Sequence, residues 1–192
     1  MEPPRLEFFY DIGSPYSYLA SERVEEVAEA GGCTLWWRPF LLEGVFRQVG
    51  SDPSVAAGPR RAYMLRDLGR WARKQSLPLR FPSTFPLDTR LAMRALAVVP
   101  RSDRGEASHA VFRALWQEER AIGNTQVLTE VLGEEVVGRA GSDEAWTTLE
   151  KNTKEALARG AFGSPSFFVG KELFFGNDRL DFVRKVLLEA VE

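Results

Sequence analysis

The sequence has few of the side chains that build thiol and metal sites. Among its 192 residues there is one cysteine, Cys33, and one histidine, His109. A single cysteine excludes an internal disulfide, and this pair cannot supply the four ligands of a structural zinc site, so we expect no metal. His109 lies in a helical stretch without a plausible nucleophile beside it, which argues against a serine or cysteine hydrolase. Cys33 follows a Gly-Gly pair and is most simply a small buried hydrophobic residue.

The sequence also lacks a strong charge of either sign and any long hydrophobic run. Its 25 Lys and Arg against 27 Asp and Glu leave a net charge of −2, so a general role in binding nucleic acid is not expected. No apolar run approaches the ~20 residues that span a bilayer, so no membrane partner is expected either. The first residues show no basic region followed by an apolar stretch, so we expect no secretory signal and a cytoplasmic location.

The pattern of apolar residues predicts an α/β chain that is interrupted by a long helical stretch. Residues 6–12 and 34–38 are strand-like and flank an amphipathic helix at 15–30. Such a unit needs a crossover helix, so its two strands are expected to be parallel. From about residue 44 to 158 the pattern is helical. Helices are predicted after Gly58-Pro59, at 89–99, at 105–119, at 124–138 and from a cap at Ser142 or Asp143.

Residues 10–18, Tyr-Asp-Ile-Gly-Ser-Pro-Tyr-Ser-Tyr, join the first strand to the first helix. Pro15 suits the first helical position, where its missing N–H costs nothing. Ser14 then falls at the N-cap, where its hydroxyl can accept a backbone N–H of the first turn. A helix N-terminus also attracts an anion through its free N–H groups and its dipole. The segment therefore allows either a plain helix cap or an anion site that Ser14 helps to form.

A second informative segment begins near residue 160. Ser164-Pro165 precedes an apolar, β-favouring run, and a proline at the start of a strand after a Gly-Ser turn is a candidate for a cis bond. The apolar runs 166–169 and 173–175 flank a polar turn and predict a β-hairpin. A last helix with apolar residues at spacings of three and four follows, and Asn177 or Asp178 is a natural N-cap for it.

Taken in order, these motifs resemble the 2-hydroxychromene-2-carboxylate isomerases. Those enzymes are close relatives of the kappa-class glutathione transferases, in the DsbA-like branch of the thioredoxin superfamily. The resemblance rests on Ser-Pro-Tyr-Ser at 14–17, Gly-x-Pro-x-Phe-Phe at 163–168, Gly-Asn-Asp-Arg-Leu at 176–180 and the middle segments Phe81-Pro82, Phe85-Pro86-Leu87 and Ala92–Leu96. It implies a thioredoxin-like α/β fold with an inserted all-helical domain. Residues 1–43 and 159–192 would form the thioredoxin-like domain, and residues 44–158 the insert.

The resemblance implies glutathione as cofactor and Ser14 as the catalytic residue. Redox members of the superfamily carry Cys-x-x-Cys where this chain has serines at 14 and 17, and a serine supplies no thiolate for disulfide exchange. Glutathione would therefore bring the sulfur, with the Ser14 hydroxyl and the helix dipole lowering its pKa. Ser164 would hold the cysteinyl backbone of glutathione in β fashion. The plain alternative is a cap at Ser14 and an ordinary turn at Ser164.

Phe175, Gly176, Asn177 and Asp178 match the family's glutathione-binding stretch. The N–H groups at 177–179 would receive the γ-glutamyl carboxylate, and Asp178 would pair with the γ-glutamyl ammonium. The alternative is that Asp178 only caps the helix.

The resemblance assigns the wall for a second substrate, a small aromatic carboxylate, to Phe46, Ser51 and Phe85. Many relatives place a lysine where Phe46 falls and an asparagine where Ser51 falls, and a cation there would suit a carboxylate substrate. Arg47, next to Phe46, is a candidate for the missing cation. Arginines at helical spacing could also steer an anion, although a solvated helix face is the commoner explanation. These basic residues are Arg60, Arg61, Arg66, Arg70, Arg73 and Lys74.

The function implied by the resemblance is the glutathione-dependent isomerisation of 2-hydroxychromene-2-carboxylate to trans-o-hydroxybenzylidenepyruvate, in a homodimer. Two alternatives stay open. The same thiol site could conjugate glutathione or reduce peroxides, as in the kappa-class transferases. The chain could also be a thioredoxin-like binding protein without catalysis, which predicts no turnover even when a thiol is present.

Overall fold

The computed structural model describes residues 4–50, 58–83 and 85–189. Within them, the strands form one mixed sheet in the order β2-β1-β3-β4. The strands are β1 Arg5–Tyr10, β2 Thr34–Pro39, β3 Ser166–Val169 and β4 Glu172–Phe175. β1 runs parallel to β2 and antiparallel to β3, and β3 runs antiparallel to β4. The predicted parallel β-α-β unit and the predicted C-terminal hairpin are both confirmed.

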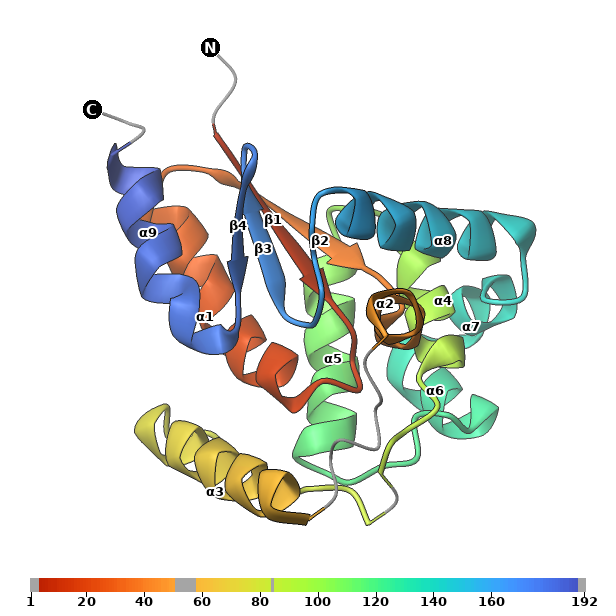
Figure 1. Cartoon of the computed structure of the whole chain (residues 1–192). Coiled ribbons are helices and arrows are strands. Elements are labelled where there is room, and N and C mark those ends of the chain that lie inside the picture. The colour runs from red at the N-terminus through yellow and green to blue at the C-terminus, as the bar shows by residue number, and fades with distance from the viewer. Residues whose placement is uncertain (1–3, 51–57, 84, 190–192) are drawn as a thin grey trace.

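The helices fall into an N-terminal, a middle and a C-terminal group (Figure 1). They are α1 Pro15–Ala30, α2 Leu42–Val49, α3 Gly58–Lys74, α4 Arg90–Val98, α5 Arg104–Trp116, α6 Thr125–Leu132, α7 Glu134–Arg139, α8 Asp143–Ala158 and α9 Leu180–Glu189. Helices α2 to α8 lie between β2 and β3 in the chain, as the predicted helical insert requires; its boundaries as a separate domain stay a prediction. The single helix predicted at 124–138 is wrong, because Gly133, at φ +85°, ends α6 before α7 begins.

Side chains of β1 alternate between two hydrophobic clusters, one on each face of the sheet. Phe8 and Tyr10 lie in a large cluster with residues of α1 and α9, whereas Phe9 and Phe168 lie in a smaller one with residues of α2 and α8. In Figure 1, α1 and α9 accordingly cover one side of the sheet, and α2 and α8 the other. Both faces of β1 are therefore buried, which explains the consecutive aromatic residues at 8–10.

One charged residue of β1, Glu7, joins the sheet to α8. Glu7 as a whole is 7% exposed. Its carboxylate accepts hydrogen bonds from Arg38 of β2 at 2.7 Å and from Arg159 at 2.8 Å. Arg38 also pairs with Glu155 of α8 at 2.5 Å. The two arginines lie over the rings of Phe9 and Phe168. This network fixes α8 against the face of the sheet that carries the smaller cluster.

The sheet topology brings two distant segments to the same place. Because β3 is antiparallel to β1, the start of β3 lies beside the end of β1, with Ser166 opposite Phe9. The segment that leads into β3 therefore meets the loop from β1 into α1. The bond between Ser164 and Pro165 is cis, as predicted, and the bond between Phe85 and Pro86 is also cis, which the sequence analysis did not anticipate.

Candidate active site

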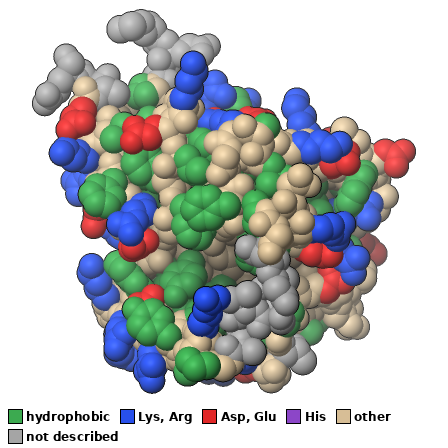
Figure 2. Space-filling view, in the orientation of Figure 1, with side chains coloured by type: hydrophobic (Ala, Val, Ile, Leu, Met, Phe, Trp, Pro, Cys, Tyr) green, Lys and Arg blue, Asp and Glu red, His purple; other side chains and the backbone are tan. Residues whose placement is uncertain are grey.

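A cavity of about 680 Å³ opens where these segments meet. Its walls come from the β1–α1 loop, the start of α2, the N-terminal half of α3, the segment leading into α4 and the turns flanking the C-terminal hairpin. Figure 2 shows hydrophobic side chains around this hollow, between the sheet and α3. Aliphatic, aromatic and proline side chains make up most of the lining, which is typical of a small-molecule site.

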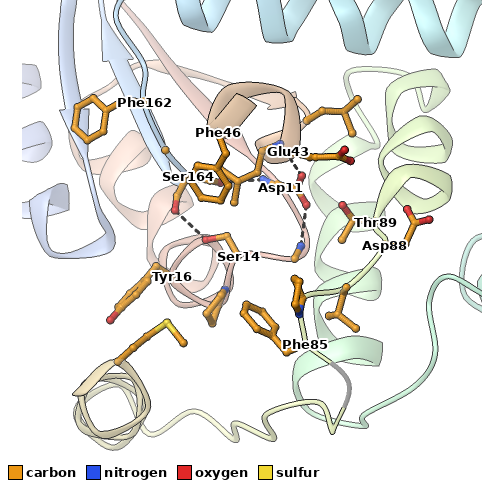
Figure 3. A pocket seen from close by; sticks show the side chains of 18 of the residues that line it. Asp11, Ser14, Tyr16, Glu43, Phe46, Phe85, Asp88, Thr89, Phe162 and Ser164 are labelled. Atoms are coloured by element: carbon orange, nitrogen blue, oxygen red, sulfur yellow. Dashed lines mark hydrogen bonds between the residues drawn. The ribbon is translucent and has the colours of Figure 1, made fainter. Parts of the chain in front are cut away.

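Ser14 lies at the floor of the cavity and caps α1. Its Oγ accepts from the backbone N–H of Ser17 at 3.2 Å, and Pro15 occupies the first helical position, so the predicted cap is confirmed. The same hydroxyl donates to the backbone carbonyl of Ser164 at 2.9 Å (Figure 3). Ser14 therefore caps α1 and also contacts the backbone of Ser164, a contact that the sequence did not predict.

The side chain of Ser164 completes a buried network of hydroxyl groups. Its Oγ accepts from the backbone N–H of Asp11 at 3.0 Å and lies 2.7 Å from the Oγ of Ser17. Ser164 thus contacts both Ser14 and Ser17, the two serines that the resemblance places at the cysteine positions of redox members. A buried network whose members all have partners holds a site in one arrangement.

Asp11, which the sequence analysis missed, joins the β1–α1 loop to the start of α2. Its carboxylate accepts from the backbone N–H of Gly13 at 2.9 Å and from that of Leu42 at 2.9 Å (Figure 3). The N-cap residue of α2, Leu41, makes no side-chain cap bond, so Asp11 caps this helix from a distant segment. Burial raises the pKa of Asp11, and the N–H groups of Leu42 and Gly13 oppose that rise.

Tyr16 joins α3 to the start of α1. Its hydroxyl donates to Asp67 of α3 at 3.0 Å, and both Tyr16 and Met64 of α3 line the cavity. The pKa of Tyr16 lies above its usual value because the ring is half-buried and because Asp67 accepts the phenolic proton. Tyr16 therefore stays a neutral hydrogen-bond donor, and α3 forms one wall beside Ser14.

The residues predicted to bind glutathione divide into two groups. Ser14, Ser164 and Phe175 line the cavity, and the Phe175 ring stacks on that of Phe162 with centroids 4.5 Å apart. Gly176, Asn177 and Asp178 lie just beyond it, where Asn177–Arg179 forms a single 3₁₀ turn before α9. Asp178 is close enough to raise the pKa of Tyr16 by its charge, although it contributes less than Asp67 does.

The predicted cap of the last helix is wrong. Neither Asn177 nor Asp178 makes a side-chain cap bond at this turn. Gly176 precedes it at φ +105°, a conformation that favours glycine, and a Cβ there would lie 2.6 Å from Oδ1 of Asp178. Asn177 is instead buried, and its Nδ2 has no partner within the described residues.

Two of the three residues predicted for the second-substrate wall line the cavity. Phe46 of α2 and Phe85 line the same cavity as Ser14, and Figure 3 shows them on either side of it. Ser51 lies outside the described residues. Arg47 does not supply the missing cation, because it is exposed, is absent from the cavity wall and donates to Glu43 at 2.8 Å.

His109 and Cys33 lie away from the cavity. His109 of α5 is within 3.7 Å of Glu22 and 3.4 Å of Glu25, and the neighbouring Ser108 hydroxyl bonds to Tyr10 instead, so no hydrolase triad forms. Cys33 is partly buried and packs against the large cluster, and burial raises the pKa of its thiol. Within the described ranges no group of three or more His, Cys, Asp or Glu is placed to hold a metal ion.

The chain matches the family described as the DSBA-like thioredoxin domain over residues 5–188. A 2-hydroxychromene-2-carboxylate isomerase from Sphingobium xenophagum is 31% identical over 206 residues, which cover 96% of this chain and 98% of that protein. The chain belongs to the 2-hydroxychromene-2-carboxylate isomerase branch of the DSBA-like thioredoxin family.

Two further likenesses agree with this membership. Glutathione S-transferase kappa 1 from Caenorhabditis elegans is 29% identical over 96% of this chain and 91% of that protein. A solved structure of 2-hydroxychromene-2-carboxylate isomerase superposes with a TM-score of 0.83 at 26% identity, over 97% of this chain and 96% of that chain. The predicted family and fold are confirmed. The prediction that the chain is an enzyme of the isomerase type is confirmed by its membership of this family. The substrate and the thiol do not follow from membership alone.

Proposed function

We propose that the protein is a glutathione-dependent cis–trans isomerase that converts 2-hydroxychromene-2-carboxylate to trans-o-hydroxybenzylidenepyruvate during the degradation of aromatic compounds. One observation carries the proposal. The Ser14 hydroxyl lies at the N-terminus of α1, against the backbone of Ser164, in a cavity with aromatic walls. The isomerase named above, with which the chain shares 31% identity, supports the choice of reaction.

The residues around Ser14 fit a thiolate. A hydroxyl donor and the positive end of a 16-residue helix stabilise an anion, and no cysteine is among the cavity residues that the structure describes. Bound glutathione would supply a thiolate that adds reversibly to a conjugated carbon of the ring-opened substrate, so that the C=C bond becomes single, rotates, and is restored when the thiolate leaves unchanged. Ser14 would stabilise the negative charge on sulfur before addition and after elimination.

Ser14 must change its hydrogen bond to act in this way. Its proton now points to the Ser164 carbonyl, which is the acceptor that an extended peptide lying beside Ser164 would use. A peptide N–H on that carbonyl would free the Ser14 hydroxyl to rotate toward the sulfur. The N–H of Ser17 would keep the oxygen of Ser14 in place meanwhile. Ligand binding and activation of the thiol are thereby coupled at one carbonyl group.

Asp178 would pair with the γ-glutamyl ammonium at the edge of the cavity. Calorimetry with glutathione tests this role. We expect Asp178→Ala to weaken binding, whereas Asp181→Ala, which removes a 74% exposed carboxylate on the first turn of α9, should leave it unchanged. Equal binding by wild type and Asp178→Ala would remove Asp178 from the site.

Phe46 and Phe85 would hold the aromatic ring of the substrate. Both belong to the insert, and the hydrogen bonds that the Asp11 carboxylate accepts from Leu42 of α2 and from Gly13 hold the insert at a set position relative to Ser14. The apolar wall also excludes water, which strengthens the electrostatic effect of Ser14 on a bound anion.

A second function, glutathione transfer, is favoured by the 29% identity to a kappa-class transferase. The mass of the product separates the two. An isomerase returns a product with the mass of the substrate and consumes no glutathione, whereas a transferase yields an adduct that contains it. Incubation with 2-hydroxychromene-2-carboxylate and with an electrophilic aromatic halide, each with glutathione, tests both. Adduct formation with the halide and no isomer from the chromene would overturn our choice, and no turnover of either would favour the non-catalytic alternative.

The homodimer stays a prediction, as does the cytoplasmic location. Among the described residues, no helix is both long enough and apolar enough to cross a membrane.

A further inference from the structure

We propose that Arg60 of α3 binds the carboxylate of the second substrate and so sets the specificity of the cavity for anionic aromatic compounds. This inference rests on the proposed function and deepens it. Arg47, the cation next to Phe46, cannot take this role, because it pairs with Glu43 and does not line the cavity.

The position of Arg60 follows from the face of α3 that meets the site. Residues spaced by three and four share one face of a helix, and Arg60, Met64 and Asp67 follow that spacing. Asp67 is fixed by the hydroxyl of Tyr16 at 3.0 Å, and Met64 and Arg60 both line the cavity. The hydrogen bond at Asp67 therefore holds this face toward Ser14.

The other charged residues of the cavity wall are already paired. Glu43 accepts a hydrogen bond from Arg47. Asp88 accepts hydrogen bonds from Arg90, from Nε at 2.9 Å and from Nη2 at 2.6 Å. The Asp11 carboxylate is buried on backbone N–H groups. Within the described residues Arg60 has no ion-pair partner, which distinguishes it from Arg90, the other cation on the wall.

The neighbouring basic residues of α3 do not share this role. Arg61 lies over the ring of Phe81, and Lys74 lies over that of Trp71. Arg66 is exposed and is not part of the cavity wall. The guanidinium of Arg60 offers two parallel N–H donors to a carboxylate, a geometry that a lysine does not reproduce.

Equilibrium binding of trans-2-hydroxycinnamate and of its neutral amide, followed by fluorescence or calorimetry, tests the inference without turnover. We expect wild type to bind the carboxylate more tightly than the amide. Arg60→Gln should weaken the carboxylate by about 10- to 100-fold and leave the amide unchanged. Arg60→Lys should recover part of the loss. Arg66→Gln, the matched control on the same helix, should bind both ligands as wild type does.

Three results would overturn the inference. These are an unchanged carboxylate affinity in Arg60→Gln, an equal loss in Arg60→Gln and Arg66→Gln, which indicates only long-range attraction, and a wild type without preference for the carboxylate. The failure of the proposed function looks different. In that case Arg60-dependent binding of the carboxylate persists while glutathione supports no isomerisation.

Discussion

The Ser14 hydroxyl donates to the carbonyl of Ser164, a residue 150 positions later in the chain, over 2.9 Å. The contact exists because β1 and β3 are antiparallel neighbours, so the residues that follow β1 meet those that precede β3. It places the only hydroxyl at the N-cap of α1 on the backbone group that would hold a peptide ligand. Ser14 is therefore both a structural cap and the group best placed to stabilise a thiolate.

Replacing Ser14 should lower activity more than replacing Ser17. On the proposed mechanism Ser14→Ala would remove a hydrogen bond to a charged sulfur, which corresponds to a rate loss of about 10- to 100-fold, and the lost cap costs about 1 kcal/mol of stability. Ser17→Ala also loses a buried bond to Ser164, yet Ser17 does not line the cavity, so only stability should fall. Turnover and chemical denaturation of both variants check this. Equal rate losses would mean that Ser14 acts only through the fold.

Cysteines at the two positions should differ in reactivity. In Ser14→Cys the thiol meets the N-terminus of α1 in an open cavity, so its pKa should fall below the ~8.5 of a free cysteine. In Ser17→Cys the thiol is fully buried, so its pKa should rise. Titration of thiolate absorbance and alkylation rates measure both. A Ser14→Cys thiol with an ordinary pKa would show that this helix end does not stabilise an anion.

The ion network at Glu7 should contribute to stability. Glu7→Gln leaves Arg38 and Arg159 without a carboxylate that they share in a buried place, and breaking such a pair costs about 3 kcal/mol. Glu43→Gln is the control, since its pair with Arg47 is exposed and contributes less than about 1 kcal/mol. Urea denaturation compares the two. Similar small losses would mean that packing alone fixes α8 to the sheet.

His109 should make stability fall as pH rises above about 6.5, the usual pKa of a histidine. Burial lowers the pKa of His109, but the hydrogen bonds and charges of Glu22 and Glu25 outweigh burial and raise it above its usual value. Its contribution is then complete below the unfolded pKa of about 6.5 and is lost as pH rises through the higher folded pKa. His109→Gln should remove this step from the pH profile of unfolding. As the only histidine, it gives one imidazole NMR signal, and a midpoint at or below 6.5 would refute the assignment.

Much of the fold was predictable because it depends on local sequence patterns. The helix start at Ser14-Pro15, the parallel β-α-β unit and the hairpin after Pro165 each depend on residues a few positions apart. The errors arose where one backbone conformation decided the outcome. Gly133 splits a continuous helical pattern, and Gly176, at φ +105°, gives a 3₁₀ turn where a side-chain cap was expected. Glycine permits such conformations, but its presence in a sequence does not predict which one it adopts.

The site was predictable only where motifs matched a known family. Ser14, Ser164, Phe175, Phe46 and Phe85 do meet in one cavity. Asp11 was missed because its partner, the N–H of Leu42, depends on how the insert docks, although an acid directly after an apolar strand was a usable signal. Arg60 could not be separated from its basic neighbours, since its orientation depends on the bond between Asp67 and Tyr16. Long-range docking of this kind leaves no local pattern.

The most direct test of the account is the turnover of 2-hydroxychromene-2-carboxylate by purified protein freed of small thiols, with and without added glutathione. The account predicts no isomerisation without thiol, isomerisation when glutathione is added, and no net consumption of glutathione. Ultraviolet difference spectra should show bound glutathione as thiolate at neutral pH, with a smaller thiolate signal in Ser14→Ala. Equal turnover without any thiol would contradict the account, because Ser14 would then have to act on the substrate itself.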